Sequence, residues 1–167
     1  IMFLVLAFAQ PYWKSSENLI TTGIPHKLMY FDASYSMQQE GEQGALINQA
    51  KLMAKDVVES SDQTARWNLI NSAANDSRHW FLAPEAVENI STISVDGSSM
   101  TGTALTEKAR QLLEERSRSA GEVHLFSDFQ KSTYSNLSFL TDTQLQFRLY
   151  PLNASVVRNL SIDTAWF

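Results

Sequence analysis

The sequence predicts an α/β domain with a doubly wound, mostly parallel sheet, helices on both faces and one antiparallel edge strand. Short apolar or alternating segments, typical of strands, take turns along the chain with amphipathic segments of helical periodicity. Strands that alternate with helices favour a parallel sheet whose helices cross over its faces. In such sheets ligands bind beyond the carboxyl ends of the strands, where the direction of winding reverses.

Strands are expected in five segments. The first is an apolar run that ends on an acid, and the last alternates between apolar and polar residues. The polar stretch Asn71–Ser77 joins two neighbouring segments and favours a hairpin, which supplies the antiparallel strand. In chain order the expected strands are Lys27–Asp32, Arg66–Ile70, Arg78–Leu82, Glu122–Ser127 and Gln144–Leu149.

Two amphipathic helices and one short helix are expected between these strands. In Gln43–Glu59 and in Thr103–Arg116, apolar residues recur at helical spacing, so each helix presents one face to a core. Pro84–Ile90 predicts a short helix, because proline suits the first helical turn.

Composition limits the classes of function. The chain of 167 residues suffices for one domain with a substantial core, and 44% hydrophobic against 19% charged residues exclude a disordered tail. The net charge is −5 and no run of Lys and Arg is present, so nucleic-acid binding is not expected. The absence of cysteine excludes disulfides, a thiolate nucleophile and a zinc ribbon.

The first residues differ in character from the rest of the chain. Ile1–Ala9 is apolar and uncharged but shorter than the roughly 20 residues that span a bilayer. Two aromatics and a lysine follow it, as at a membrane interface. It is the end of a transmembrane helix, a buried element of a soluble fold, or the apolar part of a signal peptide. With the first alternative, the chain divides into a membrane segment (1–13), a linker (14–26), the α/β domain (27–152) and the start of a β-rich domain (153–167).

Two acids and several hydroxyls gather at strand ends and at one helix start. After the first strand, an acid and two serines occupy alternate positions, so one loop can direct three oxygens to a common point. Ligands that are all oxygens suit Mg²⁺, Mn²⁺ or Ca²⁺ and disfavour Zn²⁺ and Cu²⁺. The residues are Asp32, Ser34, Ser36, Thr101, Thr103 and Asp128.

This pattern resembles the metal-ion-dependent adhesion site (MIDAS) of von Willebrand factor type A (vWA) domains, which have a Rossmann-like fold. Alignment of Gly102–Leu105 with the family's helix start, Gly-Thr-x-hydrophobic, makes Thr103 the ligand, with Thr101 as second choice. Tyr35 departs from the family, in which small residues are common at this position, and is expected to shape or partly cover the site. The ligands that the resemblance implies are Asp32, Ser34, Ser36, Thr103 and Asp128.

Four segments extend the resemblance to aerotolerance-regulator (Bat-type) membrane proteins of the Bacteroidetes. They are Leu6–Tyr12, Gly41–Leu46, Ser127–Ser132 and Ser161–Phe167. In that family two transmembrane helices precede the vWA domain. The resemblance therefore implies that Ile1–Ala9 ends the second helix and that the domain lies on the periplasmic side of the inner membrane. It also implies assembly with other vWA membrane proteins and with a MoxR-type AAA+ ATPase, in an envelope complex linked to stress tolerance.

These features favour a membrane-anchored interaction module without catalytic residues, which binds an Asp or Glu carboxylate of a partner protein through the metal. Tyr35, Met37 and Phe129 are expected to form an apolar rim around that contact. One alternative is a structural scaffold whose site binds no metal. The other is an aspartyl phosphotransferase of the haloacid-dehalogenase kind, which needs a second acid two residues after its nucleophile, where this chain has Ser34.

Overall fold

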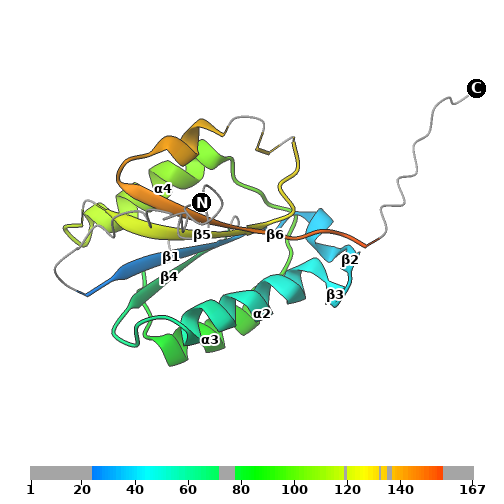
Figure 1. Cartoon of the computed structure of the whole chain (residues 1–167), viewed down its shortest axis with the longest axis horizontal. Coiled ribbons are helices and arrows are strands. Elements are labelled where there is room, and N and C mark those ends of the chain that lie inside the picture. The colour runs from blue at the N-terminus through cyan, green and yellow to red at the C-terminus, as the bar shows by residue number, and fades with distance from the viewer. Residues whose placement is uncertain (1–23, 72–77, 119, 132, 135–136, 156–167) are drawn as a thin grey trace, which may run out of the picture.

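The computed structural model describes residues 24–71, 78–118, 120–131, 133, 134 and 137–155, and it has the predicted α/β fold class. Four strands form one sheet in the order β4-β1-β5-β6, and each neighbouring pair is parallel. All four strands therefore end at the same edge of the sheet, on the right in Figure 1. The strands are β1 (His26–Phe31), β4 (Arg66–Asn71), β5 (Gly121–Ser127) and β6 (Leu145–Pro151).

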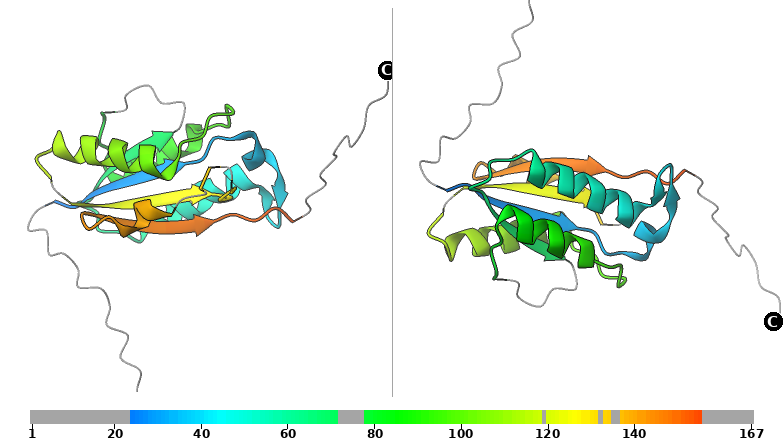
Figure 2. Two further views of the ribbon diagram at one scale, coloured as in Figure 1. Left: turned by 90° about the horizontal axis from the view of Figure 1, so that it is seen from above. Right: turned by 90° about the horizontal axis from the view of Figure 1, so that it is seen from below.

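Helices cover both faces of the sheet. On one face, α2 (Leu46–Glu59) and α3 (Ala83–Thr92) lie side by side (Figure 2). On the other face lies α4 (Gly102–Glu114), with the short helix η2 (Ser138–Thr141) beside it (Figure 1). Each helix buries the apolar stripe that its periodicity predicts, so each face of the sheet has its own apolar cluster.

The winding of the chain reverses between β1 and β5. From β1 the chain passes through α2 to β4, the outermost strand on one side of the sheet. It then returns through α4, on the opposite face, to β5 beside β1, and continues to β6. The carboxyl ends of β1 and β5 therefore lie side by side at the point where ligands bind in doubly wound sheets.

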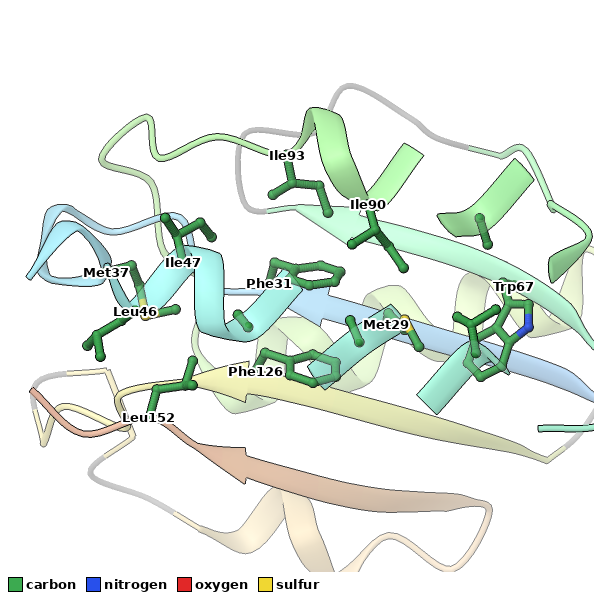
Figure 3. Packing of buried hydrophobic residues seen from close by; sticks show 14 of the residues in the cluster. Met29, Phe31, Met37, Leu46, Ile47, Trp67, Ile90, Ile93, Phe126 and Leu152 are labelled. Atoms are coloured by element: carbon green, nitrogen blue, oxygen red, sulfur yellow. The ribbon is translucent and has the colours of Figure 1, made fainter. Parts of the chain in front are cut away.

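A row of stacked rings fixes these two strand ends. Phe31, Phe126 and Tyr150 are register partners on β1, β5 and β6. The ring centroids of Phe31 and Phe126 are 5.1 Å apart, and those of Phe126 and Tyr150 are 4.4 Å apart, with interplanar angles of 11° and 16°. Figure 3 shows Phe31 and Phe126 side by side within the cluster that α2 and α3 cover. Because Asp32 and Ser127 come next in the chain, this packing holds their backbone in register.

A small hairpin that the sequence did not predict lies between β1 and α2. β2 (Glu40–Gly41) and β3 (Gly44–Ala45) pair antiparallel, and Gly44 has a φ of +93°, which favours glycine. As a consequence, α2 begins at Leu46 rather than at Gln43. Strands of two residues are too short to show a periodicity in the sequence.

The expected strand Arg78–Leu82 is reduced to a single antiparallel bridge to β4, the outermost strand. Phe81 and Trp67 exchange backbone hydrogen bonds of 2.7 and 2.9 Å, so the antiparallel direction is as predicted. On the C-terminal side of Phe81 the pairing ends because α3 begins at Ala83. The connecting residues 72–77 lie outside the described residues.

Both ends of the chain lie outside the described residues. Residues 1–23 include the expected membrane segment and most of the linker, and residues 156–167 make up most of the segment expected to start a following domain. The described residues 152–155 pack on the α/β domain, since Leu152 is buried and the Ser155 N–H and hydroxyl both donate to the Glu40 carbonyl at 3.0 Å. Of the helices described here, none is long and apolar enough to cross a membrane.

We predict that Leu105→Ala lowers the free energy of unfolding by about 2–5 kcal/mol, because the shortened side chain leaves a cavity between α4 and the sheet. Leu105 is fully buried there. Leu52→Ala is the matched control on α2, where Leu52 is 55% exposed, and it should cost no more than about 0.5 kcal/mol. Denaturant unfolding measures both variants, and equal losses would contradict the buried face assigned to α4.

Candidate metal centre

Asp32 is held at the end of β1 by hydrogen bonds from two segments. Its backbone N–H donates to the Phe126 carbonyl (3.0 Å), and the residue is only 2% exposed. Its Oδ1 atom accepts a hydrogen bond from the Ser34 N–H (3.0 Å), and Oδ2 accepts one from the Ser127 hydroxyl (2.7 Å). The carboxylate therefore bridges the carboxyl ends of β1 and β5.

The loop after β1 brings two serine hydroxyls together. Ser34 precedes the short helix η1 (Tyr35–Gln38), in which the Met37 N–H donates to the Ser34 carbonyl (3.0 Å). This turn places the hydroxyl oxygens of Ser34 and Ser36 2.9 Å apart. Since the Ser34 N–H is bonded to Asp32, the three side chains expected to share a cation lie together.

Asp128 has a carboxylate oxygen without a partner. Its Oδ2 atom accepts from the Gln130 side-chain amide (3.0 Å), whereas Oδ1 is buried and accepts no hydrogen bond from any described residue. The next residue, Phe129, has a φ of +50°, an uncommon conformation for a residue other than glycine, and its N–H donates to the Ser127 hydroxyl (3.0 Å). The turn after β5 thus keeps a buried anionic oxygen in need of a cation or a donor.

The two candidate threonines occupy different positions on α4. Thr101 is the N-cap, with its hydroxyl accepting from the Ala104 N–H (3.3 Å), so the helix begins at Gly102 rather than at Thr103. Thr103 is exposed in the first turn, on the wall of a pocket of about 400 Å³ between α4 and η2. In the part of the chain described, no hydrogen bond joins either threonine to the other four candidate ligands. The choice of Thr103 as a ligand stays a prediction.

Two residues that the sequence analysis did not propose as ligands lie beside the candidate ligands. Ser127 links Asp32 to the turn after β5, and the hydroxyl of Tyr134 is buried close to both. Burial foremost, with Tyr30 and Asp32 nearby, raises the pKa of Tyr134, so its hydroxyl stays neutral at physiological pH. Ser127 directly precedes a strand-end aspartate, which is a usable signal, whereas Tyr134 lies in an irregular segment with no pattern.

The expected apolar rim is only partly present. Tyr35 is 70% exposed, and its ring lies over Gly97, where an added Cβ atom would come within 2.6 Å of the ring. Phe129 is half-buried, with its ring centroid 5.1 Å from that of Tyr134. Met37 is fully buried in the core between the sheet and α2, so the expectation that it lines the rim is wrong. The turn of η1 directs this side chain inward and leaves its neighbours at the surface.

The donor set suits a hard divalent cation. It combines two carboxylates with neutral hydroxyls, and a carboxylate oxygen such as Oδ1 of Asp128, which has no partner among the described residues, is a ligand of the kind that Mg²⁺ prefers. Only two of the candidate ligands, Asp32 and Asp128, are carboxylates. The described ranges contain no group of three or more His, Cys, Asp or Glu side chains that could hold a metal ion. A cation bound by so few charged ligands keeps open positions for water or for an incoming carboxylate.

No protein-family model matches this chain, and no curated protein matches it. The likeness to vWA domains and to Bat-type proteins therefore depends on the residues quoted above. The geometry adds one independent observation, because Asp32 and Asp128 follow neighbouring strands at the point where the winding reverses.

We predict that Ser127→Ala lowers the free energy of unfolding by about 1–3 kcal/mol, because a buried oxygen of Asp32 loses its donor. Ser91→Ala is the control, since Ser91 is exposed and its hydroxyl donates only within α3, to the Val87 carbonyl (3.2 Å). The control should cost less than about 0.5 kcal/mol. Denaturant titration at neutral pH measures both, and an unchanged midpoint for Ser127→Ala would refute this role of the hydroxyl.

Proposed function

We propose that this chain is a protein-interaction module, not an enzyme, that is anchored to a membrane and binds an acidic residue of a partner protein through a divalent cation. Mg²⁺ is the cation we favour, and Mn²⁺ or Ca²⁺ would use the same ligands. The observation that carries the proposal is the buried Oδ1 of Asp128, which has no hydrogen-bond partner among the described residues and lies one residue after the serine that binds Asp32. The proposed ligands are Asp32, Ser34, Ser36, Thr103 and Asp128.

Coordination and charge favour a carboxylate as the group that the partner supplies. Asp32 already accepts two hydrogen bonds, so it neutralises a bound cation less completely than a free carboxylate would. A partly desolvated cation gains from one more anionic ligand. Tyr35, exposed beside the loop, offers an apolar surface next to that contact. The net charge of −5 gives no long-range attraction for an acidic partner, so affinity depends on the cation.

The same geometry disfavours phosphoryl transfer, the enzymatic alternative. Asp32 would be the nucleophile, but it is almost fully buried and both of its oxygens accept hydrogen bonds. The position two residues later, where this chemistry needs an acid, is Ser34. His124, in the middle of β5, is buried with Nδ1 3.0 Å from the Tyr150 hydroxyl, so it is not placed to act as a base at Asp32.

A scaffold that binds no metal is the second candidate, and one observation favours it. Both oxygens of Asp32 are satisfied by Ser34 and Ser127, and the hydroxyls of Ser34 and Ser36 are within hydrogen-bond distance of each other. A scaffold would keep these contacts at any concentration of divalent cation. A bound cation would instead compete for the lone pairs of the two serine hydroxyls, so a titration separates the two candidates.

The cellular setting of the proposal comes from the resemblance to Bat-type proteins. We place the domain on the periplasmic side of the inner membrane, in an envelope complex linked to stress tolerance. Other vWA membrane proteins are the proposed partners, and a MoxR-type AAA+ ATPase is the proposed partner across the membrane.

Calorimetric titration of the chain with Mg²⁺ and with Mn²⁺ should reveal one weak site. Asp32→Ala and Asp128→Asn should each abolish the heat of binding, because each removes an anionic ligand. Asp62→Asn is the control, since Asp62 is exposed and, among the described residues, its carboxylate accepts only from the N–H and hydroxyl of Thr64. Identical heats for the unmodified chain and for Asp32→Ala would refute the cation site and favour the scaffold.

Capture of the partner from detergent-solubilised membranes should depend on divalent cations. EDTA, or Ser34→Ala combined with Ser36→Ala, should abolish capture while circular dichroism stays unchanged. The control combines Ser60→Ala with Ser91→Ala, because these exposed hydroxyls donate only to carbonyls of their own helices. Recovery of the same partners in EDTA, or with the first double variant, would contradict a metal-bridged contact.

A further inference from the structure

An exposed aromatic ring lies beside the candidate cation site. Tyr35 is the first residue of η1, between the two serines of the loop after β1, and it is 70% exposed. The hydroxyl end of its ring lies against Gly97, where an added Cβ atom would come within 2.6 Å of Cζ. Gly97 has a φ of +86°, which favours glycine, so the backbone and the available space both keep this position clear for the ring. Most of the ring stays open to solvent.

The segment on which this ring packs is hydrogen-bonded to the loop after β1. The N–H groups of Asp96 and Gly97 both donate to the Ala33 carbonyl, at 3.1 and 2.9 Å. Ala33 directly follows Asp32, a candidate ligand of the cation. Asp96 therefore has a fixed position beside the cation site, and it directly precedes the glycine that contacts the Tyr35 ring.

The exposed carboxylate of Asp96 carries a charge that no described side chain balances. Its Oδ1 atom accepts hydrogen bonds from the Ser98 hydroxyl and from the Ser98 N–H, the latter at 2.9 Å. The hydroxyl foremost, and then the N–H, lower the pKa of Asp96, so the side chain is ionised at neutral pH. In the described ranges, no other residue donates to Oδ2, and no Lys or Arg forms an ion pair with Asp96.

The exposed ring and the exposed carboxylate together suit a guanidinium group. We call Tyr35 and Asp96 the ring–carboxylate pair. Because the Cα atoms of neighbouring residues are about 3.8 Å apart, the carboxylate of Asp96 and the ring on Gly97 are within reach of one long side chain. An arginine can lie flat on an aromatic ring and donate N–H groups to a carboxylate at the same time. A lysine ammonium has no flat face to stack on the ring.

We propose that the ring–carboxylate pair binds an arginine of the partner protein, close to the acid that the partner supplies to the cation. This inference rests on the proposed function, because Tyr35 and Asp96 both adjoin the loop that carries candidate ligands of the cation. The cation recognises the acid, and the pair discriminates between acidic segments by the charge beside that acid. An exposed cation–π contact and an exposed ion pair each strengthen binding by about twofold to fivefold, so together they favour arginine about tenfold.

A phage-displayed library of heptapeptides tests the proposal, with the complete chain of 167 residues as the immobilised target. Each peptide has an Asp at its centre and random residues on both sides, so the library covers every spacing between the acid and an arginine up to three residues. In Mg²⁺, the selected peptides should carry Arg at one flanking position about tenfold more often than the unselected library. EDTA should abolish the selection, because the central Asp depends on the cation.

Variants of the chain identify the two members of the pair. Asp96→Lys should reverse the preference, so that Glu replaces Arg at the enriched position, a gain that loss of the fold cannot produce. Tyr35→Leu keeps an apolar side chain without the ring and should lower the enrichment of Arg by about twofold to fivefold. Asp62→Lys is the matched control and should leave the enrichment unchanged. Asp62 is also exposed and accepts from the N–H and hydroxyl of the residue two positions later, but it lies shortly before β4 begins at Arg66.

The outcomes separate this inference from the proposed function. Selection that needs Mg²⁺ but shows no preference for Arg, or a preference that Asp96→Lys leaves unchanged, would overturn the ring–carboxylate pair and leave the metal-bridged contact standing. Selection of Arg-containing peptides that persists in EDTA and is lost with Asp96→Lys would support the pair and overturn the metal-bridged contact. Absence of any selected peptide in Mg²⁺ would overturn both.

Discussion

The burial of the Asp32 carboxylate is the constraint on which the site depends. A buried charge is costly unless hydrogen bonds satisfy it, and Asp32 obtains its two donors from Ser34 in its own loop and from Ser127 at the end of β5. These strand ends are neighbours only because the winding reverses between β1 and β5. The site therefore exists only in the assembled sheet, and a change that weakens the pairing of these strands also disturbs the ligands.

Both faces of the sheet contribute to that assembly. On the α2–α3 face, the row of stacked rings ends one residue before the site. On the α4 face, the Tyr30 hydroxyl accepts from the Met100 N–H (2.9 Å), which ties the segment before α4 to β1. Gly102 lets η2 approach α4 closely, since an added Cβ atom would come within 2.2 Å of the Phe139 ring. Packing on two sides thus fixes the elements that carry the oxygen ligands.

Most of the fold could be predicted from the pattern of apolar residues along the chain. Contacts between residues that are distant in the sequence could not be predicted. Buried parallel strands have continuous apolar runs, so β1 and β5 begin within one residue of their predicted starts. The contact of Ser127 with Asp32 joins residues 95 positions apart and leaves no local pattern. Met37 follows Ser36 directly but points into the core, because a turn of η1 that the sequence does not specify sets its direction.

The central claim is that a cation completes the site at the carboxyl ends of the strands, where Asp128 keeps a buried oxygen that no described residue contacts by a hydrogen bond. Diffraction from crystals soaked in Mn²⁺ tests it most directly, because the anomalous signal of manganese locates the ion without reference to the protein density. The account predicts one peak between Ser34 and Asp128, with Oδ1 of Asp128 as a direct ligand. A well-ordered site without a peak, or with manganese bound only elsewhere on the domain, would contradict it.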